Sequence, residues 1–181
     1  LSDLQSAGNA GEYYTPRAVT QFIVDMVNPK LGEKVLDPAC GTGGFLICSL
    51  EKMKKKAKSD SDWDILQNNI NGIEKKPLAH LLCTTNMILH GVEVPNIRHD
   101  NSLTRPLADY GPSDTVDVVV TNPPFGGAEE PGIESNFPSA YRTRETADLF
   151  LVLITKLLRD EGRCGMVLWD GFLFGEGVKT R

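Results

Sequence analysis

The stretch KVLDPACGTGGFL, residues 34–46, decides the fold of this 181-residue chain. Its first four residues, 34–37, predict a short strand that ends on Asp37. The glycines that follow predict a tight turn, and the apolar residues beyond them predict a helix that starts near Gly44. Strand, glycine turn and helix in this order are typical of the first unit of a parallel α/β sheet.

A helix is also predicted before this unit. Thr15 followed by Pro16 is the pattern of an N-cap and a first helical residue, and the asparagine and proline at 28–29 predict its end. Apolar residues recur between these limits at helical spacing: Val19, Phe22, Ile23, Met26 and Val27.

Strands and helices go on alternating after residue 46. Further strands are predicted at 69–75, 96–102, 116–121 and 164–169, and further helices at 77–91 and 145–158. The lysine-rich residues 51–64 are predicted to be the solvated end of a helix and a loop. The alternation implies an α/β fold with a doubly wound, mostly parallel sheet and right-handed crossovers.

The composition describes an ordinary globular domain. Apolar residues make up 40% of the chain and charged residues 24%, without the long apolar run of a membrane span or a signal peptide. A cytoplasmic protein is expected, and the polar start and abrupt end suggest a fragment of a longer one. The net charge of −5 has the wrong sign for holding a polyanion unaided, so a nucleic-acid partner would need a second surface.

The cysteines do not form a metal-binding pattern. Cys40, Cys48, Cys83 and Cys164 include no C-x-x-C pair and no histidine at zinc-finger spacing. Buried, reduced thiols and the absence of a metal site are therefore the expectation.

The glycine turn is predicted to bind a ligand. In a doubly wound sheet, ligands bind at the carboxyl ends of the strands, where residues 37–44 lie. The turn has no G-K-[ST] and is not a P-loop; its G-x-G-G spacing after Asp37 suits a cofactor without a pyrophosphate. Glu74, at the end of the second strand, can accept hydrogen bonds from both hydroxyls of a ribose. The alternative is a turn that only packs a helix on a strand.

The fourth strand ends in NPPF, residues 122–125, at the same edge of the sheet. Pro123 and Pro124 cannot donate hydrogen bonds, so they end the strand and leave carbonyl groups facing the cleft. The Asn122 amide oxygen and the Pro123 carbonyl could each accept a hydrogen bond from one N–H of an amino group such as N6 of adenine. The lone pair of that nitrogen would then turn toward an electrophile. Phe125 could stack on a base that has left its helix. The alternative is a rigid turn with Phe125 in the core.

Taken together and in this order, the motifs resemble those of the adenine-N6 DNA methyltransferases, and specifically the modification subunit of type I restriction-modification systems. The similar segments are GEYYTPRAV, DPACGTGGF, GIEKK, NPPFGG, TADLFLVL and LFGEGVK. The resemblance implies the Rossmann-like sheet of methyltransferases that depend on S-adenosylmethionine, truncated before its last strands. The segment VLWDG departs from the family pattern, in which a proline usually takes the place of Trp169.

The resemblance also implies roles for individual residues. S-adenosyl-L-methionine is the expected cofactor, and no metal is expected. One group would close over its methionine part: Glu12, Tyr13, Tyr14, Thr15, Pro16 and Arg17. A second group would line the other side and hold the ribose and adenine: Asp37, Gly41, Thr42, Gly43, Gly44, Glu74 and Asp100. The catalytic positions would be Asn122, Pro123 and Phe125. Asp100 has a simpler alternative role, that of capping a loop.

The implied activity is transfer of a methyl group to N6 of a flipped adenine, without a covalent enzyme intermediate. Residues 1–181 would be one catalytic domain, with a cofactor-motif helix in 1–32 and the sheet core in 33–181. The implied partners are DNA bound through a complex, a specificity subunit and, in some complexes, a restriction subunit with nuclease and translocase activity; no membrane is involved. Two alternatives stay open: methylation of a protein glutamine or an RNA base, and a non-catalytic cofactor-binding scaffold.

Overall fold

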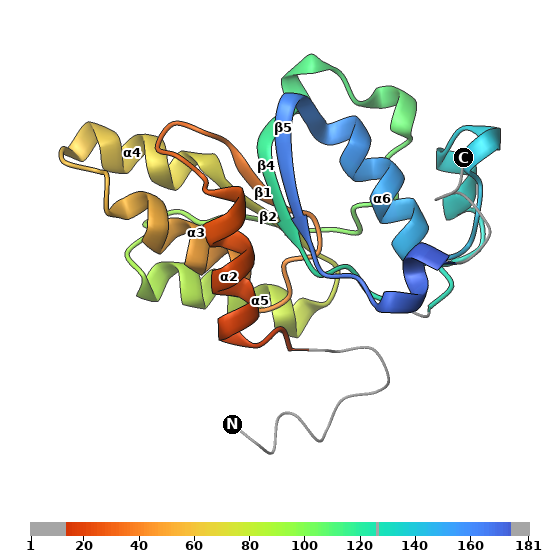
Figure 1. Ribbon diagram of the computed structural model, residues 1–181, viewed down its shortest axis with the longest axis horizontal. Helices are drawn as coiled ribbons and strands as arrows, with labels where there is room; N and C mark the ends of the chain where they lie inside the picture. The colour runs from red at the N-terminus through yellow and green to blue at the C-terminus, as the bar shows by residue number, and fades with distance from the viewer. Residues whose placement is uncertain (1–13, 126, 175–181) are drawn as a thin grey trace.

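A computed structural model of the chain describes residues 14–125 and 127–174. Its centre is a sheet of five parallel strands in the order β3-β2-β1-β4-β5 (Figure 1). The strands are β1 (Val35–Asp37), β2 (Ile70–Glu74), β3 (Asn96–His99), β4 (Val116–Thr121) and β5 (Leu158–Met166). The predicted doubly wound parallel sheet is therefore confirmed.

Helices cover both faces of the sheet. They are α2 (Arg17–Val27), α3 (Gly44–Lys54), α4 (Asp60–Asn69), α5 (Pro77–Leu89) and α6 (Thr146–Leu157). In Figure 1, α2 to α5 gather on one side of the strands and α6 lies on the other. The described residues also form short 3₁₀ helices: Leu107–Asp109, Pro112–Asp114, Ile133–Asn136, Ser139–Tyr141 and Asp170–Phe174.

The central strand β4 explains why two cores form. All six of its residues are buried, as expected for a parallel strand that is covered on both faces. Val118 and Val120 pack in the core under α2 to α5, whereas Val119 packs in the core under α6. Side chains alternate between the faces of a strand, so one apolar run supplies both cores.

The order of the strands sets the position of the functional site. From β1 the chain moves outward through β2 and β3, and then returns to place β4 on the other side of β1. The carboxyl ends of β1 and β4 therefore lie side by side at the point where the order reverses, which is where such sheets bind ligands. The glycine turn and Asn122 follow these two strands directly.

The prediction of a loop at residues 51–64 was partly wrong, because α4 begins at Asp60. The Ser59 side chain accepts a hydrogen bond from the backbone of Asp62, whose carboxylate accepts one from the backbone of Ser59. This capping box stabilises a helix start inside a strongly polar segment, where periodicity gave no signal. The last strand was also misplaced, since β5 begins at Leu158 and ends at Met166.

The predicted N-cap of the first helix was wrong, and the prediction of buried cysteines was partly wrong. Pro16 is the N-cap of α2, and the hydroxyl of Thr15 bonds elsewhere instead of capping the helix. Phe22 and Met26 are 64% and 69% exposed, so much of the apolar stripe of α2 faces outward. Cys164 is exposed, whereas the other three cysteines are buried as expected. Within the described residues, no helix is long and apolar enough to span a membrane.

Candidate functional site

Two glycines of the turn after β1 have backbone conformations that other residues rarely adopt. Gly41 has a φ of 54° and Gly43 a φ of 89°. A Cβ on Gly43 would lie 2.8 Å from the sulfur of Cys83, so this glycine is needed to pack the turn against α5. The space around a Cβ on Gly41 is open, which leaves this part of the backbone accessible to a ligand.

Glu74 joins the end of β2 to the glycine turn. Its Oε2 accepts a hydrogen bond from the backbone nitrogen of Gly41 at 2.8 Å, and its Oε1 accepts one from that of Lys76 at 2.7 Å. The residue is 9% exposed. A carboxylate has about four lone-pair sites, so two backbone donors leave capacity for a ligand's hydroxyl groups.

Asp37 is the most deeply buried acid of the site, with an exposed fraction of 1%. Its Oδ1 accepts a hydrogen bond from the backbone of Ala39, but its Oδ2 is buried without a partner among the described residues. Burial raises the pKa of Asp37 to about 7. The nearby hydroxyl of Thr121 and the backbone of Ala39 oppose this rise, and the charge of Glu74 adds to it. A cationic ligand group at this edge would favour the charged form of the carboxylate.

Asn122 follows β4, and its amide is held from one end. Its Nδ2 donates a hydrogen bond to the hydroxyl of Thr15 at 2.9 Å. Its Oδ1 is buried and has no partner in the described part of the chain, which is unusual for a buried amide. Pro123 is buried and Phe125 is half-buried, so the aromatic ring is not sealed in the core.

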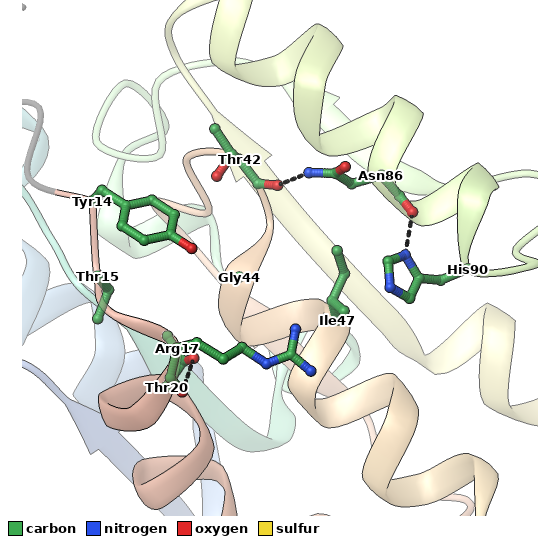
Figure 2. A pocket seen from close by; sticks show the side chains of 9 residues that line it. All are labelled: Tyr14, Thr15, Arg17, Thr20, Thr42, Gly44, Ile47, Asn86 and His90. Carbon is green, nitrogen blue, oxygen red and sulfur yellow. Dashed lines mark hydrogen bonds between the residues drawn. The ribbon is translucent and has the colours of Figure 1, made fainter. Parts of the chain in front are cut away.

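A pocket of about 200 Å³ opens between the start of α2, the glycine turn and the end of α5 (Figure 2). Five residues predicted from the sequence line it: Tyr14, Thr15, Arg17, Thr42 and Gly44. The other lining residues are Thr20, Ile47, Asn86 and His90. The segment around Thr15 and the segment around Thr42 were expected on opposite sides of the cofactor, and both line this pocket.

Asn86 and His90 are functional candidates that the sequence did not indicate. The Nδ2 of Asn86 donates to the carbonyl oxygen of Thr42 at 2.9 Å, and the Nδ1 of His90 lies 2.8 Å from the carbonyl oxygen of Asn86 (Figure 2). Arg17 donates to the carboxylate of Glu51 at 2.6 Å. Asn86 lies in α5 and His90 at its C-cap, and the packing of this helix brings both to the pocket, so no local motif could have identified them.

Asp100 lies at the same edge but outside the pocket. Its backbone donates to the carbonyl oxygen of Glu74, while its exposed carboxylate accepts from the backbone of Asn101 and pairs with Arg98. These local bonds are those of a loop-capping residue. Pro16 starts α2 and does not line the pocket. Glu12 and Tyr13 lie outside the described residues.

Residues 129–130, which follow the NPPF segment, contact the ends of two neighbouring strands. Lys75 forms ion pairs with Glu129 at 3.5 Å and with Glu130 at 3.1 Å, and the amide of Asn101 donates to Glu129 at 3.2 Å. These bonds tie residues 129–130 to the ends of β2 and β3. No cluster of metal-ligating side chains occurs in residues 14–125 and 127–174.

Known proteins match the chain over its whole length. All 181 residues match the family model described as N-6 DNA Methylase. The chain is 63% identical to the type I restriction enzyme EcoEI methylase subunit of Escherichia coli, covering 100% of this chain and 37% of that protein. It is 32% identical to the EcoKI methylase subunit of Escherichia coli strain K12, covering 97% and 34%.

Solved structures show the same fold. A chain from a type I restriction-modification system superposes with a TM-score of 0.84 at 46% identity, over 91% of this chain and 34% of that one. The EcoKI M protein superposes with a TM-score of 0.81 at 29% identity, over 93% and 36%. The chain thus spans between a third and two fifths of the length of these relatives.

Proposed function

The chain belongs to the N-6 DNA methylase family, and we propose that it is the catalytic part of a type I modification subunit that methylates adenine N6 in DNA. The observation that carries this proposal is the buried, unpartnered Oδ1 of Asn122. It lies at the point where the sheet order reverses, after the strand beside the glycine turn. A buried amide oxygen without a partner is a hydrogen-bond acceptor that a substrate donor can satisfy.

S-adenosyl-L-methionine fits the residues at this edge. Glu74 would hold the ribose hydroxyls beside Gly41, and the unpartnered Oδ2 of Asp37 suits the cationic part of the molecule. The pocket between Tyr14 and Thr42 is smaller than the roughly 300–1,000 Å³ of whole-ligand sites, and it suits the methionine end alone. The cofactor, when bound, supplies a methyl group on a positively charged sulfur.

Asn122 and Pro123 would prepare the amino group of adenine for this transfer. Its lone pair is delocalised into the ring, which makes N6 a poor nucleophile. Asn122 Oδ1 and the carbonyl of Pro123 would each accept a hydrogen bond from one N–H of N6. These two bonds would turn the lone pair of N6 out of the ring plane. N6 gains the methyl group and releases one proton to solvent. Phe125, half-buried beside them, would stack on the flipped base.

The proposed partners follow from the charge and the relatives. The net charge of −5 gives little attraction to DNA, so a specificity subunit would supply the grip and the sequence selection, and a restriction subunit could join the same complex. We further propose that residues 1–181 form one catalytic domain, with the helix in 1–32 packed on the sheet core of 33–181. In support, Arg163 of β5 donates to the backbone of Val27 at 2.8 Å.

Asn122→Ala tests the function in the complete modification complex. Cofactor affinity should stay within about threefold of wild type, while methylation of duplex DNA at the target adenine should fall by at least about a hundredfold. Asn68→Ala, on the exposed side of α4, is the matched control and should change neither quantity. Unchanged methylation by Asn122→Ala would indicate a scaffold, and methylation of RNA or a protein glutamine in place of DNA would overturn the substrate assignment.

A further inference from the structure

One hydrogen bond joins the cofactor pocket to the catalytic motif. Thr15 lines the pocket between α2 and the glycine turn (Figure 2), and its hydroxyl accepts the 2.9 Å bond from Nδ2 of Asn122. The two residues are 107 positions apart in the chain. Thr15 is half-buried, lines the pocket and bonds to Asn122, so this one side chain contacts both the pocket and the NPPF segment.

The Thr15 hydroxyl has hydrogen-bonding capacity left for a ligand in the pocket that this residue lines. A hydroxyl group has one proton to donate and two lone pairs to accept with. One lone pair is used by Asn122, and the hydroxyl makes no second hydrogen bond within residues 14–125 and 127–174. Its proton is therefore available to an acceptor in the pocket, which Arg17 also lines. The guanidinium of Arg17 pairs with Glu51 at 2.6 Å and keeps further N–H donors for a ligand. A carboxylate is the ligand group that suits both.

The direction of this bond decides which end of the Asn122 amide meets the substrate. If the hydroxyl donated to the amide oxygen, the NH₂ group would point toward the adenine amine, and two donors would face each other. If the hydroxyl accepts from Nδ2, the oxygen is left as the acceptor that the reaction needs. An acceptor that takes the Thr15 proton enforces the second arrangement.

We propose that Thr15 is a positioning residue that couples occupancy of the cofactor pocket to the orientation of the Asn122 amide. The Thr15 hydroxyl would donate a hydrogen bond to a carboxylate in the pocket, such as the amino-acid end of the cofactor. Thr15 then accepts from Nδ2, and Oδ1 is held ready for the N6 protons. The inference rests on the proposed function and adds that cofactor binding prepares the site for the flipped adenine.

The test uses Thr15→Val, which keeps the shape and removes the hydroxyl, and Thr15→Ser, which keeps the hydroxyl. Both are made in the complete modification complex, with Thr155→Val on the exposed side of α6 as the matched control. Three quantities are measured: the methylation rate at saturating cofactor, the Kd for S-adenosylhomocysteine, and the fluorescence of 2-aminopurine at the target position with and without S-adenosylhomocysteine. The fluorescence reports base flipping and does not depend on turnover.

Thr15→Val should lower the rate at saturating cofactor by about 10- to 100-fold, a typical cost of misplacing a catalytic group. It should raise the Kd for S-adenosylhomocysteine by about tenfold or more, because a hydrogen bond to a carboxylate is lost. With S-adenosylhomocysteine at saturation, it should abolish the extra fluorescence that this ligand induces. Thr15→Ser and Thr155→Val should stay within about threefold of wild type. A Thr15→Val complex that keeps the full rate and the ligand-dependent fluorescence overturns the inference. So does one whose rate is restored by raising the cofactor concentration, since Thr15 would then only line the pocket.

Asn122→Ala separates this inference from the proposed function. If Asn122→Ala still methylates DNA, the proposed function fails. If Asn122→Ala is inactive while Thr15→Val keeps full activity, only the role of Thr15 fails. The double variant should lose no more activity than Asn122→Ala alone, because both changes act through one amide.

Discussion

The carboxylate of Glu74 accepts a hydrogen bond from the backbone nitrogen of Gly41 at 2.8 Å, across 33 positions of the chain. Glu74, the acid proposed to hold the ribose, therefore also stabilises the glycine turn. Its other oxygen accepts from the backbone of Lys76, where β2 leads into α5. Affinity for the cofactor and the shape of the turn should depend on the same side chain.

Glu74→Gln should impair both properties. The amide has one accepting oxygen, so its NH₂ group must face one of the two backbone donors, and an unsatisfied buried donor costs about 1–3 kcal/mol. We expect the thermal midpoint to fall by several degrees and the cofactor Kd to rise by more than about tenfold. Calorimetry and thermal unfolding of the full-length protein measure the two effects. Glu93→Gln, at an exposed position, is the control. A Glu74→Gln protein with an unchanged thermal midpoint would show that the hydrogen bonds of Glu74 do not contribute to stability.

Gly43→Ala should destabilise the protein more than Gly41→Ala. Both positions have positive φ, which costs a non-glycine residue about 1–2 kcal/mol. Only at Gly43 would the new methyl group lie 2.8 Å from the sulfur of Cys83. Replacing Cys83 with alanine in the Gly43→Ala background should recover part of the loss, because it removes the clashing atom. Denaturant unfolding of wild type, Gly43→Ala, Cys83→Ala and the double variant measures this coupling. Strictly additive losses of stability would contradict it.

The sequence predicted the sheet and the edge that carries the site because both depend on local patterns. Strong apolar runs such as 116–121 identify strands, and glycine or proline directly after a strand identifies its carboxyl end. The glycine turn and Asn122 were expected at one edge of the sheet, and the strands that precede them, β1 and β4, are direct neighbours. The helix α4 was missed because its start depends on a capping box and not on periodicity.

Contacts between distant segments could not be predicted in the same way. Thr15 has the sequence context of a helix cap, yet its hydroxyl bonds to Asn122 because the end of β4 lies beside the start of α2. Asn86 lines the pocket because α5 packs against the glycine turn. Nothing in the sequence around Asn86 distinguishes it from the other polar residues of the helix. Cys164 was expected in a buried strand, but it lies exposed on the edge strand β5.

Phe125→Ala should slow methylation of DNA, whereas Phe125→Tyr should not. The ring is half-buried, and stacking of an aromatic side chain on a base is worth about 1–3 kcal/mol. We therefore expect loss of the ring to reduce kcat/KM for DNA by about 5- to 150-fold while cofactor affinity stays unchanged. The measurement is single-turnover methylation in the complete complex, with Phe22→Ala on the exposed side of α2 as the control. Equal rates for Phe125→Ala and Phe125→Tyr would show that the ring does not contact the base.

Asp37 should make stability depend on pH, and Asp37→Asn should remove that dependence. Burial raises the pKa of this carboxyl from 3.8 to about 7 in the folded protein. Between these values the folded state holds a proton that the unfolded state has lost, so stability falls as the pH rises from about 4 to about 7. The shift of about three pKa units corresponds to a loss of up to about 4 kcal/mol. Asp37→Asn carries no charge to bury, so it should be more stable than wild type at pH 8 and similar to it at pH 4.

The cofactor should oppose this effect in the wild-type protein. A cationic group near Asp37 stabilises the charged carboxylate, so cofactor should raise the thermal midpoint more at pH 8 than at pH 5. In Asp37→Asn the midpoint shift should be small at both pH values. Thermal unfolding of the full-length protein at pH 5 and pH 8, with and without cofactor, measures all four shifts, and Asp160→Asn at an exposed position is the control. Parallel pH profiles for wild type and Asp37→Asn would show that this carboxyl is not the group that titrates.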